Sequence, residues 1–357
     1  MPDPTARAIL IERHGPPEVL VERDVPLAHL GPFCLRLRVE AAGVNFADLL
    51  QRVGLYGTTP PLPYAPGFEV AGRVVEVGSA VEAGTWKIGD QAVALLRHGG
   101  YAREVVVATQ QAFPYPAGLT PVEAAAVPVV FLTAWVALFE AARARPGETV
   151  LVLGAGGGVG TAATQLAVRK KLKVIGTAGS QRKRDFVKQQ LGAMVCLDST
   201  DDWETEIRRR FGEHPIDIAL DSVGGAATRS CRRLLAPLGR LVFFGLSEAL
   251  PGTSRSWPSA VLAFLRTPWF HPRSLIEPNQ GVFGVHLLHL KERETVLRTA
   301  AEEIFRSVAA GELRPIVDRT FPLTRDGAVE AHHYLHARKN LCKVVLEADE
   351  PHIRSAR

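Results

Sequence analysis

A cluster of glycines directly follows an apolar segment in the middle of the chain. Residues 150–167 read VLVLGAGGGVGTAATQLA, with five glycines between Gly154 and Gly160. Glycine loses more backbone entropy on folding than any other residue, so such a cluster indicates a turn with special backbone requirements. In a dinucleotide-binding βαβ unit, glycines make the turn tight, admit the pyrophosphate and let the helix pack on the strand. The free N–H groups at the helix N-terminus then bind the phosphates.

Two registers of these glycines are compatible with such a turn. The strict GxGxxG pattern does not fit with its last glycine at Gly160. Ala155, Gly157 and Gly160 form an AxGxxG variant, whereas Gly154, Gly157 and Gly160 form GxxGxxG. A buried-type strand precedes the glycines and a helix follows them, so the context predicts a dinucleotide site rather than an empty turn.

The periodicity of the sequence changes near Thr120. Before this residue, short alternating segments separated by Gly and Pro predict a largely antiparallel β domain, with strands at 34–44, 69–78 and 103–108. Thr120, Pro121 and Glu123 fit the N-cap, first and third positions of a helix. Apolar strands then alternate with amphipathic helices, which predicts a parallel, doubly wound sheet. A helix over 292–310 and a strand near 342–348 are expected at the end.

The composition narrows the class of protein. The chain has 357 residues, is 46% hydrophobic and 22% charged, and carries a net charge of +5, which suits about two globular domains. The four cysteines form no CxxC pair, which indicates neither a disulfide framework nor a metal site. We expect no signal peptide, no apolar segment that spans a membrane and no nucleic-acid site. A soluble, cytoplasmic protein is therefore expected.

Several motifs in order along the chain resemble one known family. They are GVNFADLLQRVGLY (43–56), PGFEVAGRVVEVG (66–78), KIGDQAVAL (87–95), AAAVPVVFLTAW (124–135), the glycine turn, DSVGG (221–225) and KNLCKVVL (339–346). Together they resemble the medium-chain dehydrogenase/reductase superfamily, in its zinc-independent quinone-oxidoreductase branch. The segment 264–287 is most similar to vesicle-amine-transport-protein-like members. The resemblance implies an α/β protein with a GroES-like β-rich catalytic domain (1–128 and 291–357) and a Rossmann domain (129–290). It also implies an active site between the domains and a homodimer.

Single residues indicate whether the chain can bind zinc. By resemblance, Asn45 and Phe68 stand where zinc-dependent relatives have a Cys and a His. An amide and a phenyl group cannot replace thiolate and imidazole as zinc ligands. No four-cysteine lobe follows Asp90, and Glu69 alone does not make a site. The adjacent His332 and His333 would point in different directions. We therefore expect no metal.

The resemblance implies hydride transfer from a nicotinamide cofactor to an activated C=C bond. The substrate would be an enone or an enoyl thioester such as an enoyl-CoA. Asn45 would lie near the nicotinamide ribose and the substrate carbonyl. Tyr56 would donate a hydrogen bond or a proton, or else only form the wall of the site. Besides these two residues, the implied cofactor contacts are Thr133, Gly156, Gly157, Gly158, Val159, Gly179, Ser180, Arg182, Lys183, Ser199, Val223, Phe244, Gly245, Leu246, Phe283, Asn340 and Lys343.

NADPH is expected rather than NADH. An NAD site usually has Asp or Glu about 20 residues after the first glycine, where it binds the ribose 2′-hydroxyl. The stretch 176–181 has no carboxylate, and Ser180, Arg182 and Lys183 suit a 2′-phosphate. Relatives often have Tyr where this chain has Ser199.

Other functions stay open from the sequence. The same scaffold serves quinone reductases, and some relatives are cofactor-binding, membrane-associated or structural proteins with little turnover. The apolar segment 257–270 could be a membrane-facing loop, a buried helix, a dimer contact or a lid. Arg52, Arg97, Arg273 and Lys343 are candidates to bind an acyl-CoA at the mouth of the site.

Overall fold

The computed structural model describes residues 4–250, 252–254, 256–290 and 293–349, and it contains two compact units. Unit 1 comprises Met1–Pro128, Pro315–Lys339 and Lys343–Arg357. Unit 2 comprises Val129–Arg314 and Asn340–Cys342. Unit 1 is thus built from both ends of the chain.

Unit 1 is rich in β-structure, and its main sheet has the strand order β14-β15-β3-β4-β5-β7, with β6 paired to β3. Every pairing in it is antiparallel except that of β14 with β15. A separate hairpin is formed by β1 and β2. The largely antiparallel sheet agrees with the pattern of the first third of the sequence, and its completion by both ends of the chain agrees with the GroES-like domain that the resemblance implies. The strands are β1 (Thr5–Ile11), β2 (Leu20–Pro26), β3 (Cys34–Val44), β4 (Glu69–Val77), β5 (Gln91–Leu95), β6 (Glu104–Ala108), β7 (Ala112–Pro114), β14 (Val317–Pro322) and β15 (Lys343–Glu347).

Local sequence determines where the helices of unit 1 begin. The side chain of Thr120 accepts from Glu123 N at 3.2 Å, and Glu123 Oε2 accepts from Thr120 N at 2.9 Å. This confirms the capping box that the sequence predicts at the start of α2 (Pro121–Ala124). The unit also contains α1 (Phe46–Val53) and α11 (Arg325–His336).

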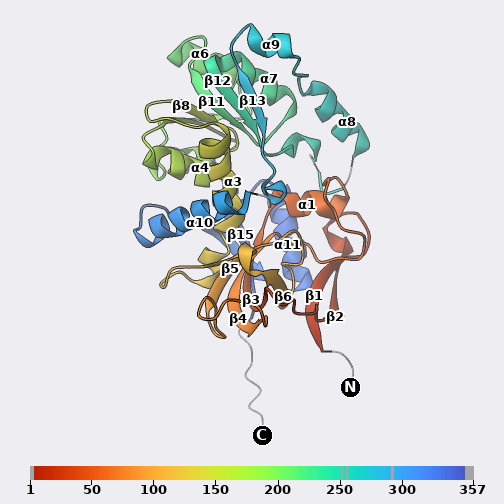
Figure 1. Cartoon of the computed structure of the whole chain (residues 1–357). Coiled ribbons are helices and arrows are strands. Elements are labelled where there is room, and N and C mark those ends of the chain that lie inside the picture. The colour runs from red at the N-terminus through yellow and green to blue at the C-terminus, as the bar shows by residue number, and fades with distance from the viewer. Residues whose placement is uncertain (1–3, 251, 255, 291–292, 350–357) are drawn as a thin grey trace. The chain divides into compact units, whose positions relative to one another are not determined.

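Unit 2 holds one six-stranded sheet with the order β10-β9-β8-β11-β12-β13, and all its pairings are parallel. The helices α4 to α7 connect successive strands, as expected for a Rossmann fold (Figure 1). Its core joins both layers, with Leu151 and Ile175 from strands and Ile207 and Leu234 from helices. The elements are β8 (Thr149–Val152), α4 (Gly158–Arg169), β9 (Lys173–Ala178), α5 (Gln181–Gln189), β10 (Val195–Asp198), α6 (Trp203–Phe211), β11 (Ile216–Asp221), α7 (Gly225–Leu234), β12 (Leu235–Phe243) and β13 (Gly281–Gly284).

The helix α10 (Glu294–Ala309) belongs to unit 2, whereas the sequence assigns residues 291–314 to the catalytic domain. Arg169, at the end of α4, forms contacts that link α10 to this unit. Its guanidinium binds Glu303 at 3.0 Å and Glu312 at 2.6 Å. These long-range ion pairs connect α10 and the turn after it to α4. Glu292, the expected first residue of this helix, lies outside the described residues.

One helical stretch is more apolar than the sequence analysis allows. Pro121–Ala141 covers 21 residues, and its most apolar 18-residue window has a mean hydropathy of 2.0, so length and composition alone would let it cross a membrane, contrary to expectation. It contains α2, α3 (Pro128–Trp135) and a π-helical turn (Val136–Ala141). In its most apolar window 72% is buried inside the protein, which is typical of a core helix.

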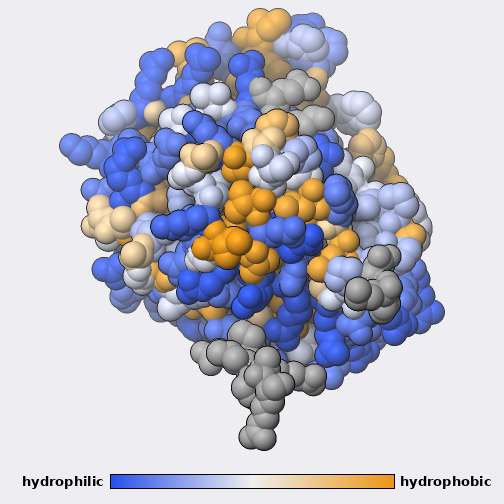
Figure 2. All heavy atoms as spheres, turned by 60° about the horizontal axis from the view of Figure 1, so that its bottom comes forward, coloured by the Kyte–Doolittle hydropathy of each residue, from blue (hydrophilic) through white to orange (hydrophobic). Residues whose placement is uncertain are grey.

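The apolar segment near residue 260 forms α8 (Trp257–Arg266), and it is not a buried helix. Trp257, Val261, Phe264 and Leu265 follow helical spacing and lie on the surface, with 52–62% of each residue exposed. Ala263 is buried instead. Surface clusters of hydrophobic residues are therefore present, and one is also visible near the middle of the face in Figure 2, among hydrophilic residues.

Candidate cofactor and substrate sites

The glycine turn has a geometry that favours glycine at one position and leaves no room for a Cβ at another. Gly154 has a φ of +64°, in the left-handed region. A Cβ on Gly160 would lie 2.2 Å from the carbonyl oxygen of Gly154. Between them, the N–H of Gly157 donates to the same oxygen at 2.9 Å, and α4 begins at Gly158. The GxxGxxG register is therefore the one that shapes the turn.

The predicted cofactor residues of unit 2 gather at the carboxyl ends of its parallel strands. Gly179 and Ser180 follow β9, Ser199 follows β10, Val223 follows β11, Phe244, Gly245 and Leu246 follow β12, and Phe283 lies in β13. Ligands of open α/β sheets bind at this edge. Thr133 is the exception, because it lies in α3 with 8% of the residue exposed.

The chain returns to the glycine turn near residue 340. The N–H of Cys342 donates to Gly156 O at 2.8 Å, and Asn340 Nδ2 donates to Cys342 O at 3.0 Å. The predicted contact Asn340 thus lies next to the turn.

The start of α5 packs against the same turn. A Cβ on Gly156 would lie 2.9 Å from Lys183 Cβ, so the stem of Lys183 covers this glycine. Ser180 caps the helix, with its Oγ accepting from Lys183 N at 3.4 Å. The hydroxyl of Ser199 lies beside Gly179. Hydroxyl groups and a lysine that adjoin a phosphate-binding turn can bind a further phosphate.

Asp221 holds the loop after β11 and was missed by the sequence analysis. Its carboxylate is buried and accepts from Val223 N (2.8 Å), Gly224 N (2.9 Å) and Thr228 Oγ1 (2.6 Å). Burial raises its pKa. An aspartate just before a Gly pair, as in DSVGG, is the signal of such a turn.

In unit 1, Asn45 lies in a buried group of charges. Its Oδ1 accepts from Lys343 Nζ at 2.6 Å, and its Nδ2 donates to Glu69 Oε1 at 2.9 Å. The ammonium also lies 2.7 Å from Glu69 Oε1 and donates to Val44 O at 2.9 Å. Of the three residues, Asn45 is 8% exposed, Lys343 3% and Glu69 0%. The end of β3 and the starts of β4 and β15 thus fix the amide of Asn45.

Asp48 supports this group from within α1. Its carboxylate accepts from Asn45 N (2.7 Å), Gly67 N (3.0 Å) and Tyr101 Oη (3.4 Å). Burial raises the pKa of Asp48 to about 7. Asp48 was not predicted as a site residue, although Asn45 and Asp48 have the spacing of a capping box.

Arg52 corrects one expectation from the sequence. It is fully buried, and its guanidinium donates to His332 Nδ1 at 2.9 Å, His336 Nε2 at 2.8 Å and Gly15 O at 3.0 Å. Arg52 and Lys343 are both buried, so neither can bind an acyl-CoA at the mouth of the site. Arg97 and Arg273 are exposed.

The two adjacent histidines do point in different directions, as predicted. His332 is fully buried, with its Nε2 3.2 Å from Tyr101 Oη. His333 is exposed and lies 2.6 Å from Glu18.

Tyr56 is half-buried, and its ring meets that of Phe68 edge-on, with centroids 5.5 Å apart. Burial, with a smaller contribution from the charge of Asp48, raises the pKa of Tyr56 to about 12. The phenol is therefore protonated at neutral pH and can act as a donor.

Metal donors are poorly arranged in the part of the chain that the structure describes. No group of three or more His, Cys, Asp or Glu residues there could hold a metal ion. The four cysteines are free thiols.

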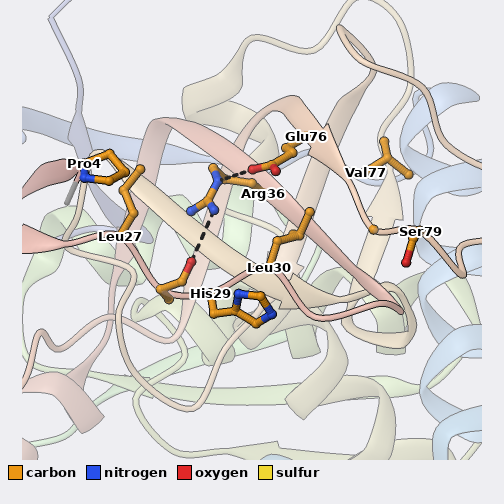
Figure 3. Close-up of a pocket in the computed structure, with 10 residues that line it drawn as sticks. Pro4, Leu27, His29, Leu30, Arg36, Glu76, Val77 and Ser79 are labelled. Atoms are coloured by element: carbon orange, nitrogen blue, oxygen red, sulfur yellow. Dashed lines mark hydrogen bonds and ion pairs between the residues drawn. The ribbon is translucent and has the colours of Figure 1, made fainter. Parts of the chain in front are cut away.

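A surface hollow of about 470 Å³ in unit 1 contains none of the predicted site residues (Figure 3). Pro4, Leu27 and His29 are among its lining residues. Arg36 also lines the hollow, and its guanidinium donates to Glu76 at 2.7 Å and to Ala28 O at 3.2 Å. It does not coincide with the sites described above.

Known protein families match the sequence of both units. Residues 31–117 match the alcohol dehydrogenase GroES-like domain, and residues 158–302 match the zinc-binding dehydrogenase domain. The mouse synaptic vesicle membrane protein VAT-1 homolog is 37% identical over 322 residues, which are 88% of this chain and 77% of the relative.

Two solved structures have the same fold over almost their whole length. The Escherichia coli quinone oxidoreductase in complex with NADPH is 27% identical, with a TM-score of 0.83, over 96% of this chain and 100% of the other. The CurK enoyl reductase is 26% identical, with a TM-score of 0.82, over 96% and 99%. With its glycine turn, its GroES-like sheet and these relatives, the chain belongs to the medium-chain dehydrogenase/reductase superfamily.

Proposed function

We propose that this protein is an NADPH-dependent reductase of the activated C=C bond of an α,β-unsaturated carbonyl, and that it works without zinc. The observation that carries the proposal is the glycine turn, where Gly154 has a φ that favours glycine and a Cβ on Gly160 would collide with the backbone. A turn of this kind supports a cofactor function, because it leaves the N–H groups at the start of α4 for a pyrophosphate.

The residues around the turn fit the cofactor. Lys183 and Ser180 at the start of α5, with Ser199 after β10, would hold the adenosine end, and the residues after β11 and β12 the nicotinamide end. A bound nicotinamide would supply the hydride. Phe283 and Asn340 are proposed as further contacts at the same edge of the sheet.

Asn45 and Tyr56 are proposed to act on the substrate. Lys343, whose ammonium lies 2.6 Å from Asn45 Oδ1, polarises the amide and makes Nδ2–H a better hydrogen-bond donor. Nδ2 donates one hydrogen to Glu69 at 2.9 Å and the other only weakly to Gly43 O at 3.4 Å. If a substrate oxygen replaced Gly43 O, this second hydrogen would stabilise the negative charge that develops on the carbonyl oxygen when the β-carbon accepts hydride. The α-carbon then takes a proton, for which the protonated phenol of Tyr56 is the proposed source.

The donor set at Asn45 does not fit zinc. A metal there would need the oxygen that Lys343 already binds, and the ammonium would repel a second cation. Phe68 offers no ligand atom. We therefore derive no step through a metal.

The acceptor can be an enone, an enoyl thioester or a quinone. The relatives with solved structures include both a quinone oxidoreductase and an enoyl reductase. We favour the C=C bond because a half-buried, protonated tyrosine suits proton delivery to carbon. Oxidation of NADPH would be measured with quinones, small enones and enoyl-CoAs. Turnover with quinones alone would show that the protein is a quinone reductase and not an enone reductase. Cofactor binding without any turnover would favour a non-enzymatic role, such as that of a membrane-associated protein.

The NADPH preference has its own test. Comparing kcat/KM for NADPH and NADH in the wild type and in Arg182→Ala/Lys183→Ala should show a preference for NADPH that the double variant loses. A wild type that favours NADH would contradict the proposal.

We further propose a cytoplasmic homodimer that acts on small molecules and does not depend on nucleic acid or membrane. Light scattering after gel filtration would test the dimer.

A further inference from the structure

A carboxylate lies where the sequence analysis expected none. Asp198 is the last residue of β10 and pairs in the parallel ladder with Ala178, the last residue of β9. The end of β9 is where an NAD site usually supplies the carboxylate that binds the ribose 2′-hydroxyl. The fold thus brings an acidic group to this place from the neighbouring strand, 20 positions further along the chain.

Arg184 from the first turns of α5 covers this carboxylate. Its Nη1 lies 2.5 Å from Asp198 Oδ2 and 3.4 Å from Ala178 O, and its Nη2 donates to Gln181 Oε1 at 2.7 Å. The two side chains are only 18% and 23% exposed. An ion pair that is largely shielded from solvent is screened less than a surface pair.

The other oxygen of Asp198 is also occupied. Thr200 donates to Oδ1 through its backbone N at 2.9 Å and its hydroxyl at 2.6 Å. These hydrogen bonds lower the pKa of Asp198, with a smaller contribution from Arg184. The carboxylate therefore stays ionised at neutral pH, and its effect on a nearby ligand depends on Arg184.

We propose that the Arg184–Asp198 pair determines whether the site takes a 2′-phosphate or a 2′-hydroxyl. With the pair intact, Arg184 neutralises the carboxylate, and a dianionic phosphate can approach the ends of β9 and β10. Without the guanidinium, Asp198 repels the phosphate and can accept a hydrogen bond from a 2′-hydroxyl. The inference rests on the proposed cofactor function and names the residues that select the cofactor.

The test uses adenosine 2′,5′-bisphosphate and 5′-AMP, which carry the two alternatives without any chemistry. Calorimetry would give both affinities for the wild type, Arg184→Met, Asp198→Asn and the double variant. Arg184→Met should lower the affinity ratio of bisphosphate to AMP about tenfold or more, because a positive charge is lost and a negative charge is uncovered. Asp198→Asn should raise the ratio, and the double variant should return toward the wild-type value.

A matched control removes a similar ion pair elsewhere in unit 2. Arg169→Met breaks the contacts with Glu303 and Glu312 and makes the same change in net charge. It should leave the ratio unchanged. If Arg184→Met weakens both ligands equally, the pair is only structural and the inference is wrong. If the wild type binds neither ligand, the proposed cofactor site itself fails.

Discussion

The ammonium of Lys343 and the carboxylate of Glu69 lie 2.7 Å apart inside unit 1, and both residues are almost completely buried. Removing one partner of a buried pair leaves an uncompensated charge, which costs about 3–5 kcal/mol. Lys343→Met should therefore lower the free energy of unfolding by about this amount, measured by denaturant titration.

The pairing predicts a recovery in the double variant. Lys343→Met/Glu69→Gln should regain most of the loss, since neither member of the pair is then left as an unpaired buried charge. As a control, Arg73→Met breaks a more exposed pair with Glu40, 2.9 Å long, and should cost about 1 kcal/mol or less. A double variant no more stable than Lys343→Met would contradict the account.

Zinc should be absent from the purified protein. Lys343 binds the oxygen of Asn45, and Phe68 stands where a ligand would be required. Metal analysis should give far less than one zinc per chain, and a chelator should leave the rate of NADPH oxidation unchanged. One tightly bound zinc per chain would refute this.

Tyr56→Phe should reduce kcat on enones by about 10²-fold or more if the phenol is the general acid. The dissociation constant for NADPH should stay the same. Tyr115→Phe is the control, because its hydroxyl accepts from Gln91 Nε2 at 3.1 Å and Gln91 is not a residue of the proposed site. If Tyr56→Phe turned over at the wild-type rate, Tyr56 would only line the site and would not be the proton donor.

His336 should make the fold sensitive to acid. Burial, and then the charge of Arg52, lower its pKa to about 4. An unfolded histidine titrates near 6.5, so between about pH 6.5 and 4 the unfolded chain binds more protons than the native protein. The contribution of neutral His336 to stability is thus complete above pH 6.5 and is lost as the pH falls through this window.

The measurement compares free energies of unfolding for the wild type and His336→Gln from pH 7.5 to 4. Asp48 and other titrating groups act on both proteins, so the difference isolates the histidine. The stability difference should shift against the wild type as the pH falls. A difference independent of pH would contradict the prediction.

The apolar face of α8 should be covered by a second copy of the chain. Large exposed apolar patches mark interaction sites, but membrane-surface helices usually carry several basic residues, and α8 has only Arg266. Phe264→Glu should shift the protein from dimer to monomer in light scattering, while Ile88→Glu, at an exposed apolar residue of unit 1, should not. The wild type should stay in the supernatant when neutral lipid vesicles are sedimented. Robust pelleting would favour the membrane instead.

The sequence predicts features that local patterns determine. The glycine turn, the alternation of strands and helices in unit 2 and the capping box at Thr120 all depend on neighbouring residues. Features that depend on distant residues were missed or misplaced. Arg169 contacts α10 and the turn after it through residues more than 130 positions away, and nothing near Asp198 in the sequence indicates Arg184 as its partner. Arg52 is another case, because arginine is rarely buried without a partner and its histidines come 280 positions later.

The position of β15 has a consequence for synthesis on the ribosome. The six strands of unit 2 are complete once residue 284 has been made, but β15, which lies between β14 and β3, consists of residues 343–347. A nascent chain can therefore form the Rossmann sheet while β3 still has an open edge and Glu69 has no ammonium beside it. Open strand edges invite pairing with other chains, so chaperones have most to protect in the part of the polypeptide that emerges first.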